Sequence, residues 1–85
     1  MEASIQLDII SPAKTLVSEK VGFVTMPGIA GNFEVLKDHA PLITALDAGV
    51  ICYGLPGEEK KLAIKSGFVE VRDNYVTICV EGAEE

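Results

Sequence analysis

Four side chains of this 85-residue sequence have the chemistry for nucleophilic catalysis: the thiols Cys52 and Cys79, the single histidine His39, and its neighbour Asp38. Such a set works only when nucleophile, base and orienting group lie within hydrogen-bond reach of one another. Both cysteines fall inside apolar runs typical of β-strands, whereas reactive thiols occupy electropositive, partly exposed sites. The pattern favours two reduced thiols that pack as small apolar residues, and it predicts no catalytic residue. Whether the two thiols lie close together stays open.

Metal and cofactor sites also lack their usual residues. One histidine, two cysteines in strand-like runs and dispersed carboxylates do not match the ligand spacing of a zinc site, and no Asp-rich loop has calcium spacing. The glycine-rich stretch at residues 27–31 is not followed by the Lys-Ser/Thr pair and the helix pattern of a phosphate-binding loop. The sequence therefore predicts neither a metal nor a cofactor.

The charge balance excludes several classes of partner. Thirteen acidic residues against seven basic ones give a formal net charge of −6, whereas binding to a phosphate backbone depends on Lys and Arg. We expect no nucleic-acid partner and no direct docking on anionic lipid. No apolar run approaches the roughly 20 residues that span a bilayer, and residues 4–11 are too short and too charged for a secretory signal. We expect no direct membrane insertion, and attachment to a membrane only through another protein.

The amount of apolar sequence points to a protein partner. Hydrophobic residues make up 48% of a chain that has room for a single domain over residues 1–85. A small domain cannot hide so much apolar surface alone. The run around Val21, Phe23, Val24 and Met26 is apolar on both faces of its strand. We therefore expect a partner to cover the outer face there.

Hydrophobic periodicity predicts β-strands throughout. Ile5, Leu7 and Ile9 alternate with polar residues, which is the period-two pattern of a half-buried strand. Further strands are expected at residues 15–18, 20–26, 33–36, 50–55, 61–65, 68–73 and 75–80, with breaks or turns at residues 11–12, 27–31, 56–57, 66–67 and 74. Helical periodicity is absent. The acidic residues 82–85 form a tail that is expected to pack against nothing.

Short strands joined by Gly, Pro and Asn turns at intervals of about ten residues are typical of sandwiches and barrels. The predicted fold class is therefore all-β: a flattened antiparallel β-sandwich or barrel of about ten short strands. In such a fold each strand turns one face to the core and one outward.

His39 has two interpretations. In the first it is a loop residue whose ring nitrogens bond to nearby backbone, while Pro41 forces Ala40 out of the helical region so that the next strand starts extended. In the second, His39 shapes a surface that meets another protein. The residue pattern alone leaves both open.

Three stretches resemble the epsilon subunit of F-type ATP synthases: "LDIISP" at residues 7–12, "GNFEVLKDHAPLITALDAGV" at residues 31–50, and "SGFVEVRDNYVTICVE" at residues 66–81. Their order also matches that family. The segment His-Ala-Pro-Leu-x-Thr-Ala-Leu, ending in Gly49, is the most specific part. The resemblance covers nearly all of residues 5–81.

The resemblance implies a non-catalytic rotor subunit of the central stalk. The amino-terminal domain of that family is a flattened ten-stranded β-sandwich. It binds the gamma subunit and sits on the ring of membrane c subunits, in a complex that also holds alpha and beta subunits, and it helps to couple proton transport to ATP synthesis. For this chain the resemblance implies a peripheral location at the cytoplasmic face of a bacterial plasma membrane, attached through the complex.

The resemblance also implies interface residues. The family's loop that faces the c-ring falls on Ala30, Gly31 and Asn32. The segment near gamma falls on His39, Ala40, Pro41 and Leu42, and Ser11 also maps close to gamma. On this resemblance His39 lines a protein interface and takes no part in proton transfer.

The chain departs from the family pattern in several places. Many members have Gly where Glu34 stands, Pro-Gly where this chain has Lys37-Asp38, and a second Gly where Phe68 follows Gly67. Most bacterial and chloroplast members also continue into a carboxy-terminal helical hairpin that can inhibit ATP hydrolysis. This sequence is then either a short member or a separated domain. We expect it to support assembly and coupling without imposing that inhibition.

The competing hypothesis is a stand-alone β-sandwich that binds a small ligand or peptide. Such a module needs a deep pocket with converging polar groups. A rotor subunit instead exposes an extended apolar face that is covered only in a complex. The shape and polarity of the surface therefore discriminate between the two.

Overall fold

The computed structural model describes residues 3–83, which form nine β-strands. In chain order these are β1 (Ile5–Ile10), β2 (Thr15–Val21), β3 (Phe23–Gly28), β4 (Gly31–Val35), β5 (Leu42–Leu46), β6 (Gly49–Gly54), β7 (Lys60–Ile64), β8 (Ser66–Arg72) and β9 (Tyr75–Glu81). The prediction of an all-β fold is confirmed. No helix within the described residues has the length and apolar character of a membrane span.

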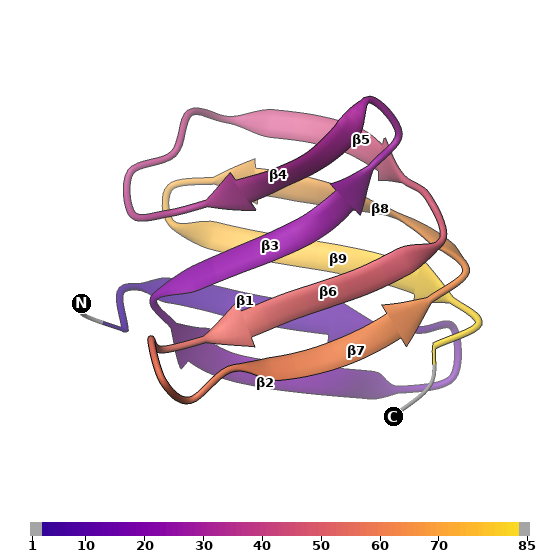
Figure 1. The fold of residues 1–85 in the computed structure, drawn as a ribbon, viewed down its shortest axis with the longest axis horizontal. Helices are drawn as coiled ribbons and strands as arrows, with labels where there is room; N and C mark the ends of the chain where they lie inside the picture. The colour runs from indigo at the N-terminus through magenta and orange to yellow at the C-terminus, as the bar shows by residue number, and fades with distance from the viewer. Residues whose placement is uncertain (1–2, 84–85) are drawn as a thin grey trace.

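The strands form one sheet that folds over on itself into two layers (Figure 1). Neighbouring strands follow the order β2-β1-β9-β8-β5-β3-β6-β7, and β4 pairs with β3. We call β2, β1, β9, β8 and β5 the back layer, and β4, β3, β6 and β7 the front layer. The layers join where Gly28 of β3 pairs with Leu46 of β5. A hydrogen bond from the Asp47 N–H to the Pro27 carbonyl, 2.8 Å long, reinforces this junction.

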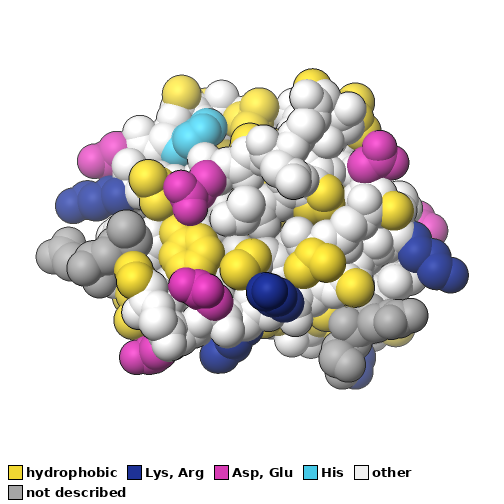
Figure 2. All heavy atoms as spheres, in the orientation of Figure 1, with side chains coloured by type: hydrophobic (Ala, Val, Ile, Leu, Met, Phe, Trp, Pro, Cys, Tyr) yellow, Lys and Arg dark blue, Asp and Glu magenta, His cyan; other side chains and the backbone are white. Residues whose placement is uncertain are grey.

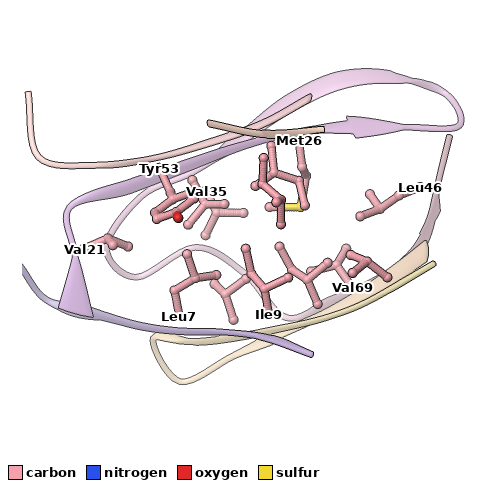
Figure 3. Packing of buried hydrophobic residues seen from close by; sticks show 14 of the residues in the cluster. Leu7, Ile9, Val21, Met26, Val35, Leu46, Tyr53 and Val69 are labelled. Carbon is pink, nitrogen blue, oxygen red and sulfur yellow. The ribbon is translucent and has the colours of Figure 1, made fainter. Parts of the chain in front are cut away.

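A hydrophobic core fills the space between the layers (Figure 3). Leu7, Ile9 and Val69 point inward from the back layer, toward Met26 and Val35 of the front layer. No polar or charged side chain of residues 3–83 is buried. The period-two alternation explains this division, because every second residue of a strand points to the same face.

The predicted strand at residues 20–26 is two strands in the structure. β2 continues to Val21, which pairs with Ile5 of β1, and β3 begins at Phe23 in the other layer. Gly22 lies at the crossing between the layers, and its N–H donates to the Gly54 carbonyl at 2.8 Å. Periodicity missed the crossing because the residues on both sides of it are apolar.

The structure differs from the predicted antiparallel sandwich of about ten strands in two ways. The described residues form nine strands, and one strand pairing is parallel. β1 and β9 run parallel, with Leu7 beside Val76 and Ile9 beside Ile78. Parallel neighbours need a long connection, and most of the chain separates these two strands. β1 therefore lies inside the back layer, between β2 and β9.

Two predicted breaks lie within strands. Pro27 and Gly28 are the last residues of β3, where they pair with Asn32 and Gly31 of β4. Residues 66–67 open β8, so that Lys65 alone separates β7 from β8. Pro is tolerated at a strand end, where its missing N–H costs no central ladder bond.

The apolar run around Val21, Phe23, Val24 and Met26 is covered by the chain itself. All four side chains are buried, and Phe23 lies in a depression that Leu36, Cys52 and Pro56 also line. The prediction that a partner covers this face is therefore wrong. On the front layer, hydrophobic side chains are interspersed with charged ones of both signs (Figure 2).

The predicted tail also packs more than expected. Ala83 is partly buried and packs against the core. The Glu81 carbonyl accepts a hydrogen bond from the Lys65 N–H at 3.1 Å, so the chain remains tied to the sheet up to that point. The remainder of the predicted tail, residues 84–85, lies outside the described residues.

The two ends of the folded sheet are linked by an ion pair. Lys60 of β7 places its Nζ 3.2 Å from both carboxylate oxygens of Glu19 in β2. Such partly exposed pairs contribute at most about 1 kcal/mol. Burial, and after it the charge of Glu19, raises the pKa of the nearby Tyr53 phenol above its ordinary value, while Lys60 opposes the rise.

The centre of the back layer sets the stability of the domain. Ile78 is fully buried in β9, between β1 and β8. We predict that Ile78→Ala lowers the free energy of unfolding by about 2–5 kcal/mol, because it opens a cavity that rigid strands cannot refill. Urea denaturation measures the effect. Thr77→Ala, on the outer face of the same strand, is the control, and equal losses for both variants would contradict the inward position of Ile78.

Tyr53 makes stability depend on alkaline pH. Because its pKa is raised in the folded state, the unfolded chain loses the phenolic proton first as pH rises through 10.0, and the free energy of unfolding then falls. This contribution is fully present below pH 10.0. We predict that Tyr53→Phe reduces the loss of stability between about pH 9 and about pH 11, measured by urea denaturation. Tyr75→Phe is the control, and an unchanged pH slope in Tyr53→Phe would refute the assignment.

Candidate interaction surface

The loop between β4 and β5 holds His39 in a defined turn. The His39 N–H donates to the Leu36 carbonyl at 3.2 Å, which closes a four-residue turn. Asp38, the third residue of that turn, has a φ of 64°, as a type II turn requires there. The His39 Nδ1 lies 2.7 Å from the Ala40 carbonyl oxygen. Since a carbonyl only accepts, Nδ1 carries the hydrogen in this contact.

The loop leads directly into β5 with an exposed apolar edge. Ala40 and Pro41 are exposed, and Leu42 is half-buried as the first residue of β5. The prediction that His39 bonds to nearby backbone is confirmed by its contact with Ala40. That bond fixes the ring and leaves the segment from Ala40 to Pro41 open to a partner.

The residues with catalytic chemistry do not form a working set. Cys52 in β6 and Cys79 in β9 are free thiols on the outer faces of different layers, so the core separates them. Asp38 accepts a hydrogen bond from Asn74, and the His39 ring bonds to backbone. Among residues 3–83, no three His, Cys, Asp or Glu side chains are placed to hold a metal ion.

The residues predicted to face the c-ring lie at the tip of the β3–β4 hairpin. Gly28 pairs with Gly31 across a two-residue turn, so Ile29 and Ala30 form the tip. Ala30, Gly31 and Asn32 are all exposed. Ile29 is 63% exposed, although it is a large hydrophobic residue. Sequence reasoning missed Ile29, and its place between the two turn glycines was the signal that could have found it.

Ser11 and His39 lie at opposite ends of the back layer. Strand registers place Leu42 level with Val71, and Leu46 level with Gly67. Gly67 is level with Val80, just beyond the pairing of Ile10 with Cys79. Ser11 follows Ile10 and therefore lies near the end that carries the β3–β4 hairpin, away from His39. A five-residue strand spans about 17 Å, so these two predicted gamma contacts do not form one compact patch.

Two large hydrophobic residues are exposed on the outer face of the back layer between these two ends, and polar Glu70 and Thr77 lie beside the first of them. Ile43 of β5 is 73% exposed and Phe68 of β8 is 54% exposed. Phe68 pairs with Ala45 on one side and with Cys79 on the other, and Cys79 pairs in turn with Ile10. The alternation in β5 and β8 could have predicted that these two residues are exposed. Thr44 and Val69 face the core, so their neighbours Ile43 and Phe68 face outward.

Two depressions bear on the ligand-binding hypothesis. An apolar one of about 290 Å³ lies beside Phe68 and is lined by Ile10, Pro12 and Cys79 among others. A polar one of about 410 Å³ is lined by Gln6, Asp8 and Ser18, whose side chains bond to one another. The Ser18 hydroxyl donates to Asp8 Oδ1 at 2.7 Å. The apolar site lacks converging polar groups, and three of the polar side chains at the polar site bond to one another, which does not favour a built ligand pocket at either place.

The hairpin tip depends on a glycine. Gly31 has a φ of 127°, and no heavy atom lies within 4 Å of the position of an added Cβ. We predict that Gly31→Ala lowers the free energy of unfolding by about 1–3 kcal/mol through backbone strain alone. Urea denaturation tests this, with Asn32→Ala as the control at the next exposed position. A neutral Gly31→Ala would show that the tip relaxes freely.

Comparison with known proteins identifies the domain. Residues 4–85 match the family described as ATP synthase, Delta/Epsilon chain, beta-sandwich domain. The ATP synthase epsilon chain of Carboxydothermus hydrogenoformans is 39% identical over 84 residues, and that of Lawsonia intracellularis is 42% identical over 85 residues. These matches cover 99% and 100% of this chain, but only 63% and 64% of the relatives. The chain thus spans less than two thirds of their length.

Solved structures agree on the fold. A chain of the Euglena gracilis mitochondrial ATP synthase (OSCP/F1/c-ring) superposes with a TM-score of 0.88 at 24% identity, covering 99% of this chain and 54% of that one. A chain of the Tetrahymena thermophila mitochondrial ATP synthase central stalk and c-ring gives a TM-score of 0.81 at 16% identity, covering 96% and 66%. Together with the family match over residues 4–85, the nine-stranded sandwich establishes that this chain belongs to the β-sandwich domain family of ATP synthase delta and epsilon chains.

Proposed function

We propose that the chain acts as the non-catalytic sandwich domain of an epsilon subunit in the central stalk of a bacterial F-type ATP synthase. In this role it binds the gamma subunit and the c-ring, in a complex with alpha and beta subunits, and helps to couple proton transport to ATP synthesis. It is held at the cytoplasmic face of the plasma membrane through the complex. The family match over residues 4–85 carries the proposal.

The β3–β4 hairpin tip is the proposed contact with the c-ring. Ala30, Gly31 and Asn32 are exposed there, and Ile29 adds an apolar side chain at the same tip. A two-residue turn between paired glycines presents these side chains on a short, stiff hairpin. The hydrogen bond from the Ile29 N–H to the Ala45 carbonyl, 3.2 Å, further ties the tip to the back layer.

The outer face of the back layer is the proposed contact with gamma. Ser11 and His39 mark its two ends, and a partner that touches both must lie across the strands between them. Phe68 and Ile43 occupy that intervening surface and are largely exposed. Exposed aromatic and aliphatic residues surrounded by polar ones are typical of the core of a protein interface. Gamma therefore contacts an extended face, which continues through the start of β5 into the preceding loop at Leu42, Pro41 and Ala40.

A hydrogen-bonded sandwich suits a part that carries torque. Its core is hydrophobic, and no polar or charged side chain within the described residues is buried. Close-packed apolar interiors have low compressibility and transmit strain. Force applied at the hairpin tip therefore passes through the sheet to the outer face of the back layer with little deformation.

Co-purification tests the proposal. The tagged chain, expressed in its host and recovered from gently solubilised membranes, should bring gamma, alpha, beta and c subunits in fixed ratio. A clean monomer without ATP synthase subunits would leave the fold intact and remove the function. It would favour the stand-alone ligand-binding module instead.

Single substitutions locate the gamma contact. We predict that Phe68→Glu reduces gamma binding at least tenfold, because a carboxylate would be buried at the interface without a partner. Ile43→Glu should act in the same direction. Val50→Glu is the matched control, since Val50 is also about half exposed but lies on β6 in the front layer. Binding measured by surface plasmon resonance would contradict the assignment if Phe68→Glu and Val50→Glu behaved alike.

A further inference from the structure

We propose that Asn74 is a positioning residue that holds the His39 loop in the conformation its partner binds. The inference rests on the proposed function of that loop. Asn74 lies in the β8–β9 turn, 36 residues from Asp38, yet its side chain bonds twice to that residue. Asn74 Oδ1 accepts the Asp38 N–H at 2.7 Å, and Asn74 Nδ2 donates to Asp38 Oδ1 at 3.1 Å. We call this pair of hydrogen bonds the Asn74 clasp.

The His39 loop needs such support because its turn is built on an unfavourable residue. Asp38 has a φ of 64°, in the left-handed region that favours glycine. Asp tolerates this conformation better than most residues, but at a cost that Gly does not have. The turn Leu36–His39 is also exposed over its first three residues, so core packing does not hold it. The clasp bonds to the residue that bears the cost.

Asn74 is itself a fixed point. Asp73 and Asn74 have φ values of 51° and 63° and form a two-residue turn between Arg72 and Tyr75, which is the type I′ pattern of tight hairpins. The Asn74 carbonyl accepts the Gln6 N–H at 2.9 Å, which ties the turn to β1. The clasp therefore connects the His39 loop to three strands of the back layer: β8, β9 and β1.

The amide chemistry selects asparagine for both tasks. A turn residue with positive φ is satisfied by Gly, Asn or Asp. Only Asn also offers one acceptor and one donor in the geometry found here. Asp at position 74 would set a carboxylate against the Asp38 carboxylate, and Gly would remove both bonds. A simple turn requirement thus predicts that Gly is tolerated, whereas the clasp predicts that Gly releases the loop.

Asn74→Gly separates these two readings. Gly preserves the hairpin turn, so the midpoint of urea denaturation should stay close to that of the wild type. Amide hydrogen exchange at Asp38 should become roughly tenfold faster, because its N–H loses its acceptor. The gamma subunit should bind roughly tenfold more weakly, since apparent affinity falls with the population of the competent conformation. Asp73→Gly, in the same turn but without a bond to the loop, is the control. It should change neither the exchange rate at Asp38 nor the affinity for gamma.

Asp38→Gly provides a rescue. Glycine adopts positive φ without strain, so Asp38→Gly combined with Asn74→Gly should remove the strain that opposes the turn and recover at least half of the lost affinity on a logarithmic scale. A purely structural role of Asn74 in the β8–β9 hairpin would not be repaired by a change in another loop. Failure of the rescue would overturn the positioning role.

The remaining outcomes also decide the question. If the wild-type chain binds gamma and Asn74→Gly binds equally well, the positioning role falls and the proposed function stands. Unchanged exchange at Asp38 in Asn74→Gly would likewise overturn the clasp. If the wild-type chain shows no binding to gamma at all, the proposed function falls, and the positioning role falls with it.

Discussion

The apolar contact between the two layers is the constraint on which the rest of the molecule depends. Each of the nine described strands buries at least one hydrophobic side chain in that core, and no side chain classed as polar or charged among residues 3–83 is buried. Such a core has no hydrogen-bonded network to specify register. Register is set instead by which residues are apolar, because a slip of one position would turn each inward set outward. Apart from the Tyr53 phenol, the polar side chains are thereby confined to the outer faces and the strand ends.

This confinement explains the character of the candidate surface. The features that distinguish it are shapes and exposed apolar groups, such as Ile29 at a hairpin tip and Phe68 on a sheet face. The two predicted contact regions lie at different places on one rigid body, and the junction between Gly28 and Leu46 connects them. His39 could act as an acid or a base, but its Nδ1 bonds to the Ala40 carbonyl. The residue therefore helps to fix the shape of its loop.

Much of the fold could be predicted from period-two alternation, and the failures have physical causes. Ile5, Leu7 and Ile9 are all fully buried, as alternation requires. The crossing of the chain from one layer to the other at Gly22 was not predicted, because the residues on both sides of it are apolar. The parallel pairing of β1 and β9 escaped because strand pairing between distant segments leaves no local signature. For the surface, the resemblance suggests a role for Ala30 to Asn32 that stays a prediction, and the Asn74 clasp has no sequence signature because it joins residues 36 positions apart. The resemblance also did not indicate that Ser11 and His39 lie at opposite ends.

The position of β1 has a consequence for biogenesis. β1, which is synthesised before the other eight described strands, pairs on one side with β2, but its other side is completed only by β9. Until residues 75–81 have emerged, β1 presents an open edge of unpaired N–H and C=O groups, and such edges invite pairing with other chains. The back layer is therefore completed only after residues 75–81 have been synthesised, and until then the free edge of β1 has to be kept from pairing with other chains.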